Sequence, residues 1–156
     1  MAKRVLTVDD SASSRAMVSF TLRRAGYEVV EAEDGVEGLE RATEQHIDLV
    51  LTDQNMPRMD GLTLIKSLRQ MPTYRKAPIL VLTSEPCDDL KTRGREAGAT
   101  GWMVKPFDPQ RLLTLVKQAI GLASPSLLKS GRKHHLIDNR VSPAHNGLAA
   151  APFAVR

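Results

Sequence analysis

The sequence feature that most constrains the fold is a short apolar run that ends in a carboxylate. Residues 49–52 read Leu-Val-Leu-Thr, carry no charge and lead directly into Asp53. A short uncharged run with β-branched members is typical of a strand buried on both faces. Pro57 disfavours the helical conformation for Met56, so the strand must give way to a loop. The pattern predicts that Asp53 stands at the carboxyl end of a central strand, which is the edge where ligands bind in open α/β sheets.

Similar apolar runs recur along the chain and alternate with helical patterns. They predict strands at residues 4–8, 27–32, 48–52, 78–82 and 102–104. Helices are predicted from Ser11 to Gly26, from Asp34, from Asp60 to Pro72, over residues 85–97, and up to Gly121. Short connections and right-handed crossovers between such elements give a parallel sheet covered by helices on both faces. We therefore predict an α/β, doubly wound fold with five strands and five helices.

The helix predicted over residues 85–97 has a thin apolar face, with little to bury besides Leu90 and Ala97. The last helix, by contrast, has five apolar residues at helical spacing: Leu112, Leu115, Val116, Ala119 and Ile120. A helix with few apolar contacts packs weakly, so we expect the helix over residues 85–97 to be the mobile one.

The net charge of +4 is unevenly distributed along the chain. Residues 122–156 hold five basic residues against Asp138 alone, so residues 1–121 are neutral. Hydrophobic periodicity stops after Gly121, and proline, glycine and serine punctuate the remainder. We therefore expect one domain over residues 1–121 and a basic, flexible C-terminal tail over residues 122–156. The tail is too short for a usual DNA-binding output domain, and we expect no nucleic-acid partner.

The composition also indicates in which cellular compartment the protein works. No apolar run approaches the length needed to span a bilayer, and Asp9 and Asp10 interrupt the apolar start that a signal peptide would need. The single cysteine, Cys87, excludes an internal disulfide. We expect a cytoplasmic protein without a membrane partner.

Polar residues with related chemistry stand at the carboxyl ends of the predicted strands. Asp9 and Asp10 follow the first strand, Asp53 the third, Thr83 the fourth and Lys105 the fifth. Three converging carboxylates cannot all stay ionised without a cation, and oxygen ligands with open positions suit Mg²⁺. A hydroxyl and an ammonium are the donors that a phosphoryl group requires. The residues alone predict phosphoryl transfer to the carboxylate of Asp53.

Four motifs then make the pattern specific. They are Val8-Asp9-Asp10-Ser11, the run from Asp53 to Gly61 (Asp-Gln-Asn-Met-Pro-Arg-Met-Asp-Gly), Leu82-Thr83-Ser84 and Val104-Lys105-Pro106-Phe107. In this order and spacing they resemble the receiver domain of two-component response regulators, and among these the stand-alone CheY-like proteins. The resemblance covers residues 4–121. It implies the flavodoxin-like strand order 2-1-3-4-5.

The resemblance also implies roles for individual residues. Asp53 would accept a phosphoryl group from the phosphohistidine of a histidine kinase or a phosphotransfer protein, and slow self-hydrolysis would reset it. Asp10 and Asp53 would bind Mg²⁺ directly together with the backbone carbonyl of Asn55, and Asp9 would act through water. Lys105 would pair with Asp53 before transfer and with the phosphoryl group afterwards.

A switch and an output surface are implied in the same way. Thr83 would move toward the phosphoryl oxygen, and the aromatic residue at position 102 would rotate inward. A downstream protein would then bind the surface of the fourth helix, fifth strand and fifth helix, in chemotaxis or in a phosphorelay. The peptide bond between Lys105 and Pro106 would be cis.

One residue departs from the family pattern. The switch position usually holds tyrosine or phenylalanine, and here it holds Trp102. Because an indole is larger than a phenol, our hypothesis is that Trp102 stays partly exposed and serves as an anchor for a partner.

Two other functions remain open. One is a magnesium-dependent phosphohydrolase that uses Asp53, although such enzymes often carry a second carboxylate two residues after the nucleophile, where this chain has Asn55. The other is a protein-binding module that is never phosphorylated.

Overall fold

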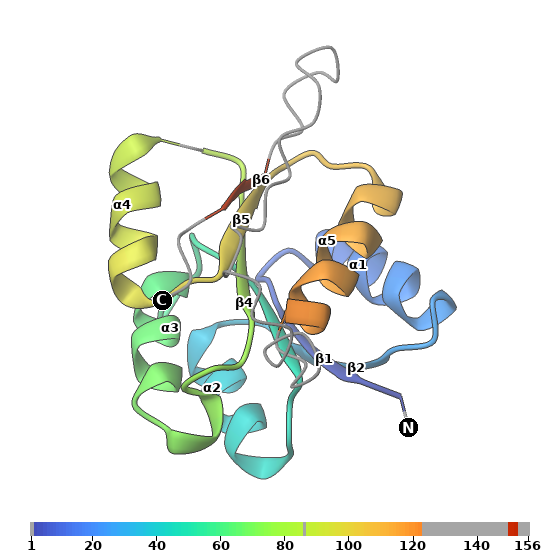
Figure 1. The fold of residues 1–156 in the computed structure, drawn as a ribbon, viewed down its shortest axis with the longest axis horizontal. Coiled ribbons are helices and arrows are strands. Elements are labelled where there is room, and N and C mark those ends of the chain that lie inside the picture. Colours follow the sequence, from blue (N-terminus) through green and yellow to red (C-terminus); the bar gives the residue numbers. More distant parts are fainter. Residues whose placement is uncertain (1, 86, 123–149, 153–156) are drawn as a thin grey trace.

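The fold is a parallel sheet with helices on both faces (Figure 1). The computed structural model describes residues 2–85, 87–122 and 150–152. Five parallel strands lie in the order β2-β1-β3-β4-β5. Their bounds are β1 Arg4–Val8, β2 Glu28–Ala32, β3 Leu49–Asp53, β4 Ile79–Thr83 and β5 Gly101–Val104. The predicted doubly wound α/β fold and its strand order are confirmed.

In the described part of the chain, four α-helices and one 3₁₀ helix connect the parallel strands, and a fifth α-helix follows β5. Their bounds are α1 Ala12–Arg24, α2 Gly35–Glu44, α3 Gly61–Arg69, η1 Pro72–Tyr74, α4 Asp88–Ala97 and α5 Pro109–Leu122. Helices α1 and α5 cover one face of the sheet, and α2, α3 and α4 cover the other (Figure 1). Each face has its own apolar cluster because both faces of the central strands are buried.

Side-chain caps fix where three helices begin. The Ser11 hydroxyl, the Asp34 carboxylate and the Asp60 carboxylate each accept a backbone N–H three residues further on. These bonds satisfy N–H groups that have no partner inside the helix. The helix starts predicted at Ser11, Asp34 and Asp60 are confirmed, and they matter because each helix follows a strand at the carboxyl edge of the sheet.

The bounds of α3 and α4 differ from those expected. Helix α4 begins at Asp88 instead of Glu85, and the Sγ atom of Cys87 caps it by accepting the Leu90 N–H at 3.4 Å. Proline disfavours the helical backbone conformation in the residue before it. Glu85 precedes Pro86 and is therefore not the first residue of the helix. Helix α3 ends at Arg69, and Pro72 begins η1 instead of ending α3.

A sixth strand was not predicted. Residues Ala150–Pro152 form β6, which pairs antiparallel with β5. Residues 123–149 and 153–156 lie outside the described part of the chain, so the flexible tail stays a prediction. None of the helices in the described ranges is both long enough and apolar enough to cross a membrane.

Candidate functional site

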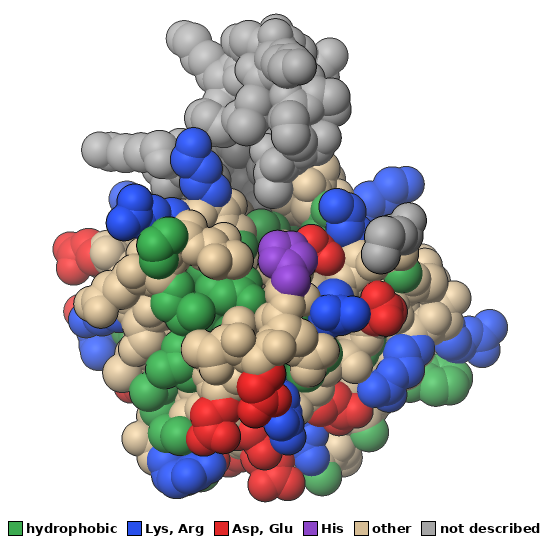
Figure 2. Space-filling view, turned by 90° about the horizontal axis from the view of Figure 1, so that it is seen from below, with side chains coloured by type: hydrophobic (Ala, Val, Ile, Leu, Met, Phe, Trp, Pro, Cys, Tyr) green, Lys and Arg blue, Asp and Glu red, His purple; other side chains and the backbone are tan. Residues whose placement is uncertain are grey.

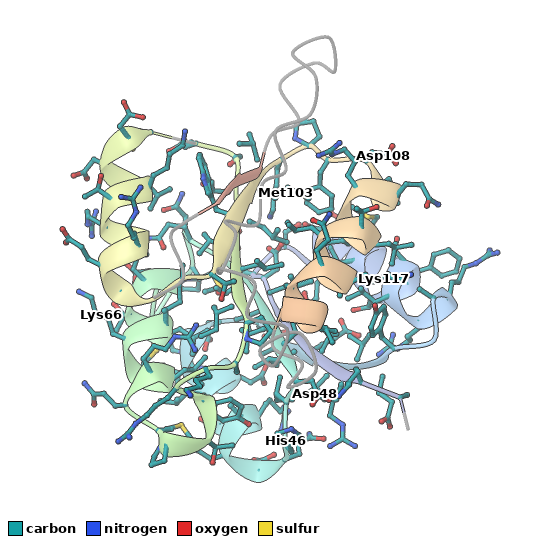
Figure 3. The ribbon with its side chains drawn as sticks, viewed as in Figure 1. His46, Asp48, Lys66, Met103, Asp108 and Lys117 are labelled. Carbon is teal, nitrogen blue, oxygen red and sulfur yellow. The ribbon has the colours of Figure 1, made fainter. Side chains whose placement is uncertain are left out.

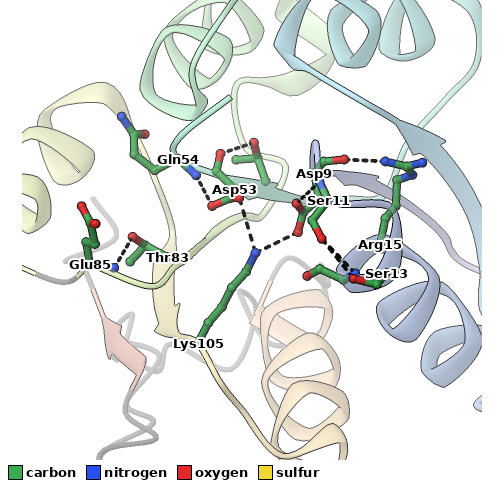
Figure 4. Close-up of polar contacts among 11 residues, drawn as sticks. Asp9, Ser11, Ser13, Arg15, Asp53, Gln54, Thr83, Glu85 and Lys105 are labelled. Carbon is green, nitrogen blue, oxygen red and sulfur yellow. Dashed lines mark hydrogen bonds and ion pairs between the residues drawn. The ribbon is translucent and has the colours of Figure 1, made fainter. Parts of the chain in front are cut away.

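The site lies at the carboxyl edge of the sheet, between the ends of β1, β3 and β5 (Figure 4). Val8 pairs with Thr52 in the parallel register, so Asp9 and Asp53 leave neighbouring strands side by side. Lys105 follows the last residue of β5 and reaches the same point. Topology therefore brings together residues that are widely separated in the sequence.

Three carboxylates form a compact acidic cluster. One oxygen each from Asp9, Asp10 and Asp53 lies within 4.8 Å of the other two. Asp9 is buried, Asp53 is partly buried and Asp10 is exposed, so the cluster opens to solvent on one side. Several hard oxygen donors beside open positions are the arrangement that Mg²⁺ prefers. The donor set therefore fits this cation.

Lys105 partly neutralises the cluster. Its Nζ atom lies 2.8 Å from Oδ2 of Asp9 and 3.4 Å from Oδ2 of Asp53. Burial alone would lower the pKa of Lys105, but the hydrogen bond to Asp9 and the charge of Asp53 outweigh it and the pKa is raised. Lys105 therefore remains a cation, and it is shared between two carboxylates, not held by Asp53 alone.

Asp53 is placed where its negative charge is unfavourable. Burial raises the pKa of Asp53, Lys105 counteracts this, and the neighbouring Asp9 raises it further. The net result is a pKa above the ordinary value for aspartate. A cation that binds beside Asp53 would relieve this repulsion.

Arg15, which no sequence motif indicated, positions Asp9. The Nη1 atom of Arg15 donates to the backbone carbonyl of Asp9 at 2.6 Å, and Nε donates to Glu31 at 3.2 Å. The Ser11 N–H also donates to the Asp9 carboxylate at 2.9 Å (Figure 4). An arginine four residues after a helix cap gives no distinctive signal in one sequence, because such arginines are usually solvated.

Gln54 was missed as well. Its backbone N–H donates to Oδ1 of Asp53 at 2.8 Å, and its buried side-chain Oε1 accepts the Leu62 N–H at 3.0 Å. The Gly61 N–H donates to the Gln54 carbonyl at 3.0 Å. A Cβ atom on Gly61 would collide with the backbone carbonyl of Asp53. Only glycine fits there, so Gln54 and Gly61 together close the loop that follows β3.

Thr83 stands at the end of β4, the strand next to β3, and Asn55 follows Asp53 by two residues. Thr83 ends β4 and is buried, and its Oγ1 accepts the Glu85 N–H at 3.1 Å. Its backbone carbonyl accepts the Lys105 N–H at 2.8 Å, which ties the ends of β4 and β5 together. Asn55 is exposed in the loop after β3. The peptide bond between Lys105 and Pro106 is cis, as the resemblance implied.

Trp102 is not where our hypothesis placed it. The side chain is only 2% exposed, so the partly exposed anchor is wrong. The indole lies beneath α4 in a small apolar hollow lined by Leu62, Val81, Leu90 and Gly94. Gly94 contributes no side chain, which leaves room for the larger ring, and the Lys91 ammonium lies 4.6 Å from the ring centroid. Its neighbour Met103 points to the opposite face of β5, toward the cluster of α1 and α5 (Figure 3).

The opposite end of the sheet carries a different set of polar groups. His46 and Asp48 lie just before β3, with Nε2 and Oδ1 3.1 Å apart (Figure 3). On the face shown in Figure 2, Lys and Arg side chains are mixed with Asp and Glu side chains.

Comparison with known proteins decides the family. The family described as the response regulator receiver domain matches residues 5–117. This chain belongs to that family. The predicted receiver domain is thereby confirmed, and receiver domains are signalling proteins, not conventional enzymes.

Curated relatives of this receiver domain differ in their architecture. The chain is 37% identical over 125 residues to the phosphate regulon transcriptional regulatory protein PhoB of Klebsiella pneumoniae, covering 80% of this chain and 55% of that protein. It thus spans about half the length of the first curated relatives that it matches. It is also 37% identical to a chemotaxis protein CheY homolog of Campylobacter jejuni, covering 78% of this chain and 95% of that protein.

Solved structures show the same CheY-like receiver fold. Chemotaxis protein CheY4 of Vibrio cholerae is 45% identical with a TM-score of 0.75, covering 76% of this chain and 99% of that one. The receiver domain of the sensor histidine kinase PA1611 from Pseudomonas aeruginosa is 26% identical with a TM-score of 0.72, covering 78% of this chain and 99% of that one. The latter structure has a magnesium ion coordinated in its active-site cleft.

Proposed function

We propose that this receiver domain accepts a phosphoryl group on Asp53 and so switches a partner-binding surface. The observation that carries the proposal is the acidic cluster of Asp9, Asp10 and Asp53 with Lys105 across it. A carboxylate nucleophile beside a cation site and an ammonium meets the requirements of phosphoryl transfer, which depends on positioning and charge neutralisation.

Mg²⁺ is the cofactor in this proposal. Asp10 and Asp53 would bind it directly with the backbone carbonyl of Asn55, and Asp9 would act through water. Bound there, the cation supplies positive charge for the oxygens of the transferred phosphoryl group. The open side of the cluster at Asp10 supports this assignment, because Mg²⁺ usually keeps water and a phosphate oxygen among its ligands.

The transfer step assigns a role to each side chain. An oxygen of Asp53 attacks the phosphorus of a phosphohistidine, the new O–P bond forms, and the N–P electron pair returns to the leaving imidazole. Lys105 then exchanges its contact with Asp53 for one with the phosphoryl oxygens. Water later hydrolyses the acyl phosphate slowly, which resets the domain.

The partners follow from this chemistry. A histidine kinase or a phosphotransfer protein in the cytoplasm would supply the phosphoryl group. Thr83 would move toward the phosphoryl oxygen, and Trp102 would respond to that movement. A downstream protein in chemotaxis or in a phosphorelay would bind the surface of α4, β5 and α5. The backbone hydrogen bond from the Lys105 N–H to the Thr83 carbonyl joins the ends of β4 and β5, and it supports this coupling.

Intact mass spectrometry after incubation with acetyl phosphate tests the proposal. We expect the wild-type protein to gain the mass of one phosphoryl group with Mg²⁺ present and none when the metal is chelated. The Asp53→Asn variant should gain nothing in either condition. A wild-type protein that binds its partners but never gains the mass would be a constitutive binding module. Continuous release of phosphate from small phosphate esters would instead indicate a phosphohydrolase.

A further inference from the structure

The loop between β3 and α3, residues 54–60, carries Asn55 and is held closed at its ends. The Gln54 carbonyl accepts the Gly61 N–H at 3.0 Å, and the Gln54 side chain accepts the Leu62 N–H at 3.0 Å. These bonds fix where the loop leaves β3 and where it enters α3. They leave the middle of the loop to be held by other contacts.

The amino-terminal end of α2 supplies those contacts. The Nε atom of Arg58 donates to Oδ2 of Asp34 at 2.8 Å, and the Gly35 N–H donates to the Met59 carbonyl at 3.2 Å. Asp34 is nearly buried, and its other oxygen caps α2 by accepting the Glu37 N–H at 2.9 Å. Because that cap fixes the carboxylate, Arg58 is anchored to a rigid point.

Arg58 holds an unfavourable backbone conformation. Its φ angle is +66°, and it is the only described residue other than glycine with a positive φ. Side chains larger than asparagine rarely adopt this left-handed region. Such strain persists only where surrounding contacts hold it, and it clusters at functional sites.

We propose that Arg58 is a positioning residue for the Mg²⁺ site: paired with Asp34, it locks the loop of residues 54–60 so that the Asn55 carbonyl faces the acidic cluster. This inference rests on the proposed function, and it adds two residues that do not touch the metal. Arg58 and Asp34 do not bind the metal. They act through the backbone on one ligand, the carbonyl of Asn55.

An electrostatic role for Arg58 makes the opposite prediction. A positive charge near a cation site repels the cation, so removing that charge alone would strengthen Mg²⁺ binding. If Arg58 and Asp34 instead act as a clamp that locks the loop, removing Arg58 would weaken Mg²⁺ binding. The direction of the change in affinity therefore separates the two roles.

The test compares two variants that lose the same charge. Arg58→Asn keeps a residue that tolerates the left-handed backbone but cannot reach Asp34 with a cation. Arg93→Asn is the matched control, because Arg93 is 56% exposed against 59% for Arg58 and pairs with Asp89 on α4, outside the loop. Calorimetric titration with Mg²⁺ alone gives the dissociation constant, and urea unfolding without metal gives the stability of each variant.

We expect the Mg²⁺ dissociation constant to rise about tenfold in Arg58→Asn, a typical effect of losing an outer contact to a metal ligand. Arg93→Asn should leave it within about twofold, since an exposed distant charge is screened. Stability without metal should be similar in both variants. Asp34→Asn, which keeps a good helix cap, should weaken Mg²⁺ binding like Arg58→Asn, and the double variant should be no weaker than either alone.

Unchanged or tighter Mg²⁺ binding in Arg58→Asn would overturn the clamp. So would a loss of affinity that matches Arg93→Asn. A wild-type protein that binds no Mg²⁺ would overturn the proposed metal site together with the clamp, whereas wild-type binding with an unaffected Arg58→Asn would overturn the clamp alone.

Discussion

Asp53 is a carboxylate whose surroundings disfavour its charge. It is partly buried beside Asp9, and Lys105 lies closer to Asp9 than to Asp53. A residue selected only for stability would not be an ionised aspartate at this point. An unfavourable environment for a charged side chain is expected where a cation or an incoming phosphoryl group binds.

Replacing Asp53 should therefore stabilise the metal-free protein. Because the pKa of Asp53 is raised in the folded state, ionisation of Asp53 costs stability at neutral pH, and this cost vanishes below the ordinary aspartate pKa of about 4. We expect Asp53→Asn to raise the free energy of unfolding at pH 7 by about 1 kcal/mol, the usual scale for one altered contact. Urea unfolding of both proteins with a chelator present measures this.

The pH dependence provides the control for that prediction. The advantage of Asp53→Asn should shrink as the pH falls and disappear below the ordinary aspartate pKa of about 4, where Asp53 is protonated in both the folded and the unfolded wild type. A variant that is less stable than the wild type at neutral pH would contradict our account of the site.

Mg²⁺ should make the wild type more stable than Asp53→Asn, which reverses the order expected without metal. At a Mg²⁺ concentration of about one hundred times the dissociation constant, wild-type unfolding should become harder by about 2.7 kcal/mol through mass action alone. Asp10→Asn should show little of this gain, because it removes one of the expected direct ligands. Thermal unfolding with and without the metal measures the effect, and equal shifts in both proteins would place the Mg²⁺ elsewhere.

Helix α4 is anchored unequally at its two ends. At its carboxyl end, Arg69 donates to the Gly98 carbonyl through Nε at 2.9 Å and Nη2 at 2.8 Å. The same guanidinium donates through Nη1 to the carbonyls of Tyr74 and Ala77. At its amino end, the side-chain cap of α4 within the described residues is the sulfur of Cys87, which accepts the Leu90 N–H at 3.4 Å and is a weak acceptor. We therefore expect the amino end of α4 to be the part that shifts over Trp102.

Loss of the Arg69 anchor should destabilise the domain. Burial lowers the pKa of Arg69 to about 10, and its loss would leave three carbonyls without their donor. We expect Arg69→Met to lower the free energy of unfolding by about 3 kcal/mol. Arg93→Met on the exposed side of α4 is the control and should change it by less than about 0.5 kcal/mol.

Hydrogen exchange would localise that effect. Amides at the carboxyl end of α4 and in η1 should lose protection in Arg69→Met, since both segments contact the guanidinium. A loss of protection confined to α1 and α5 would show that Arg69 does not anchor α4.

Across the whole molecule, local patterns predicted the fold and the acidic cluster well. Parallel strands deliver all their carboxyl ends to one edge, so the alternation of runs and helices was enough to bring Asp9, Asp53 and Lys105 together. The burial of Trp102 was not predictable, because it depends on Gly94 of a different element facing the indole. The left-handed backbone conformation of Arg58 was not predictable for the same reason, because Asp34, which holds Arg58, caps a helix that is distant in the sequence.

Trp102 can report on the whole domain, because it is the only tryptophan in the chain. The buried indole should emit at short wavelength and resist quenching by iodide. Phosphorylation should change this emission in the wild type and leave Asp53→Asn unchanged, if Thr83 and Trp102 form the switch. An emission that stays constant while the protein gains a phosphoryl group would contradict that coupling.

The most direct test of the central claim is to identify the phosphorylated residue itself. After incubation with acetyl phosphate and Mg²⁺, borohydride reduces an aspartyl phosphate to homoserine, and peptide mass spectrometry locates that homoserine. We predict homoserine at position 53 alone, with none in a sample prepared under chelation. Homoserine at position 9 or 10, or a phosphoryl group that resists borohydride and maps to a serine or histidine, would contradict the account.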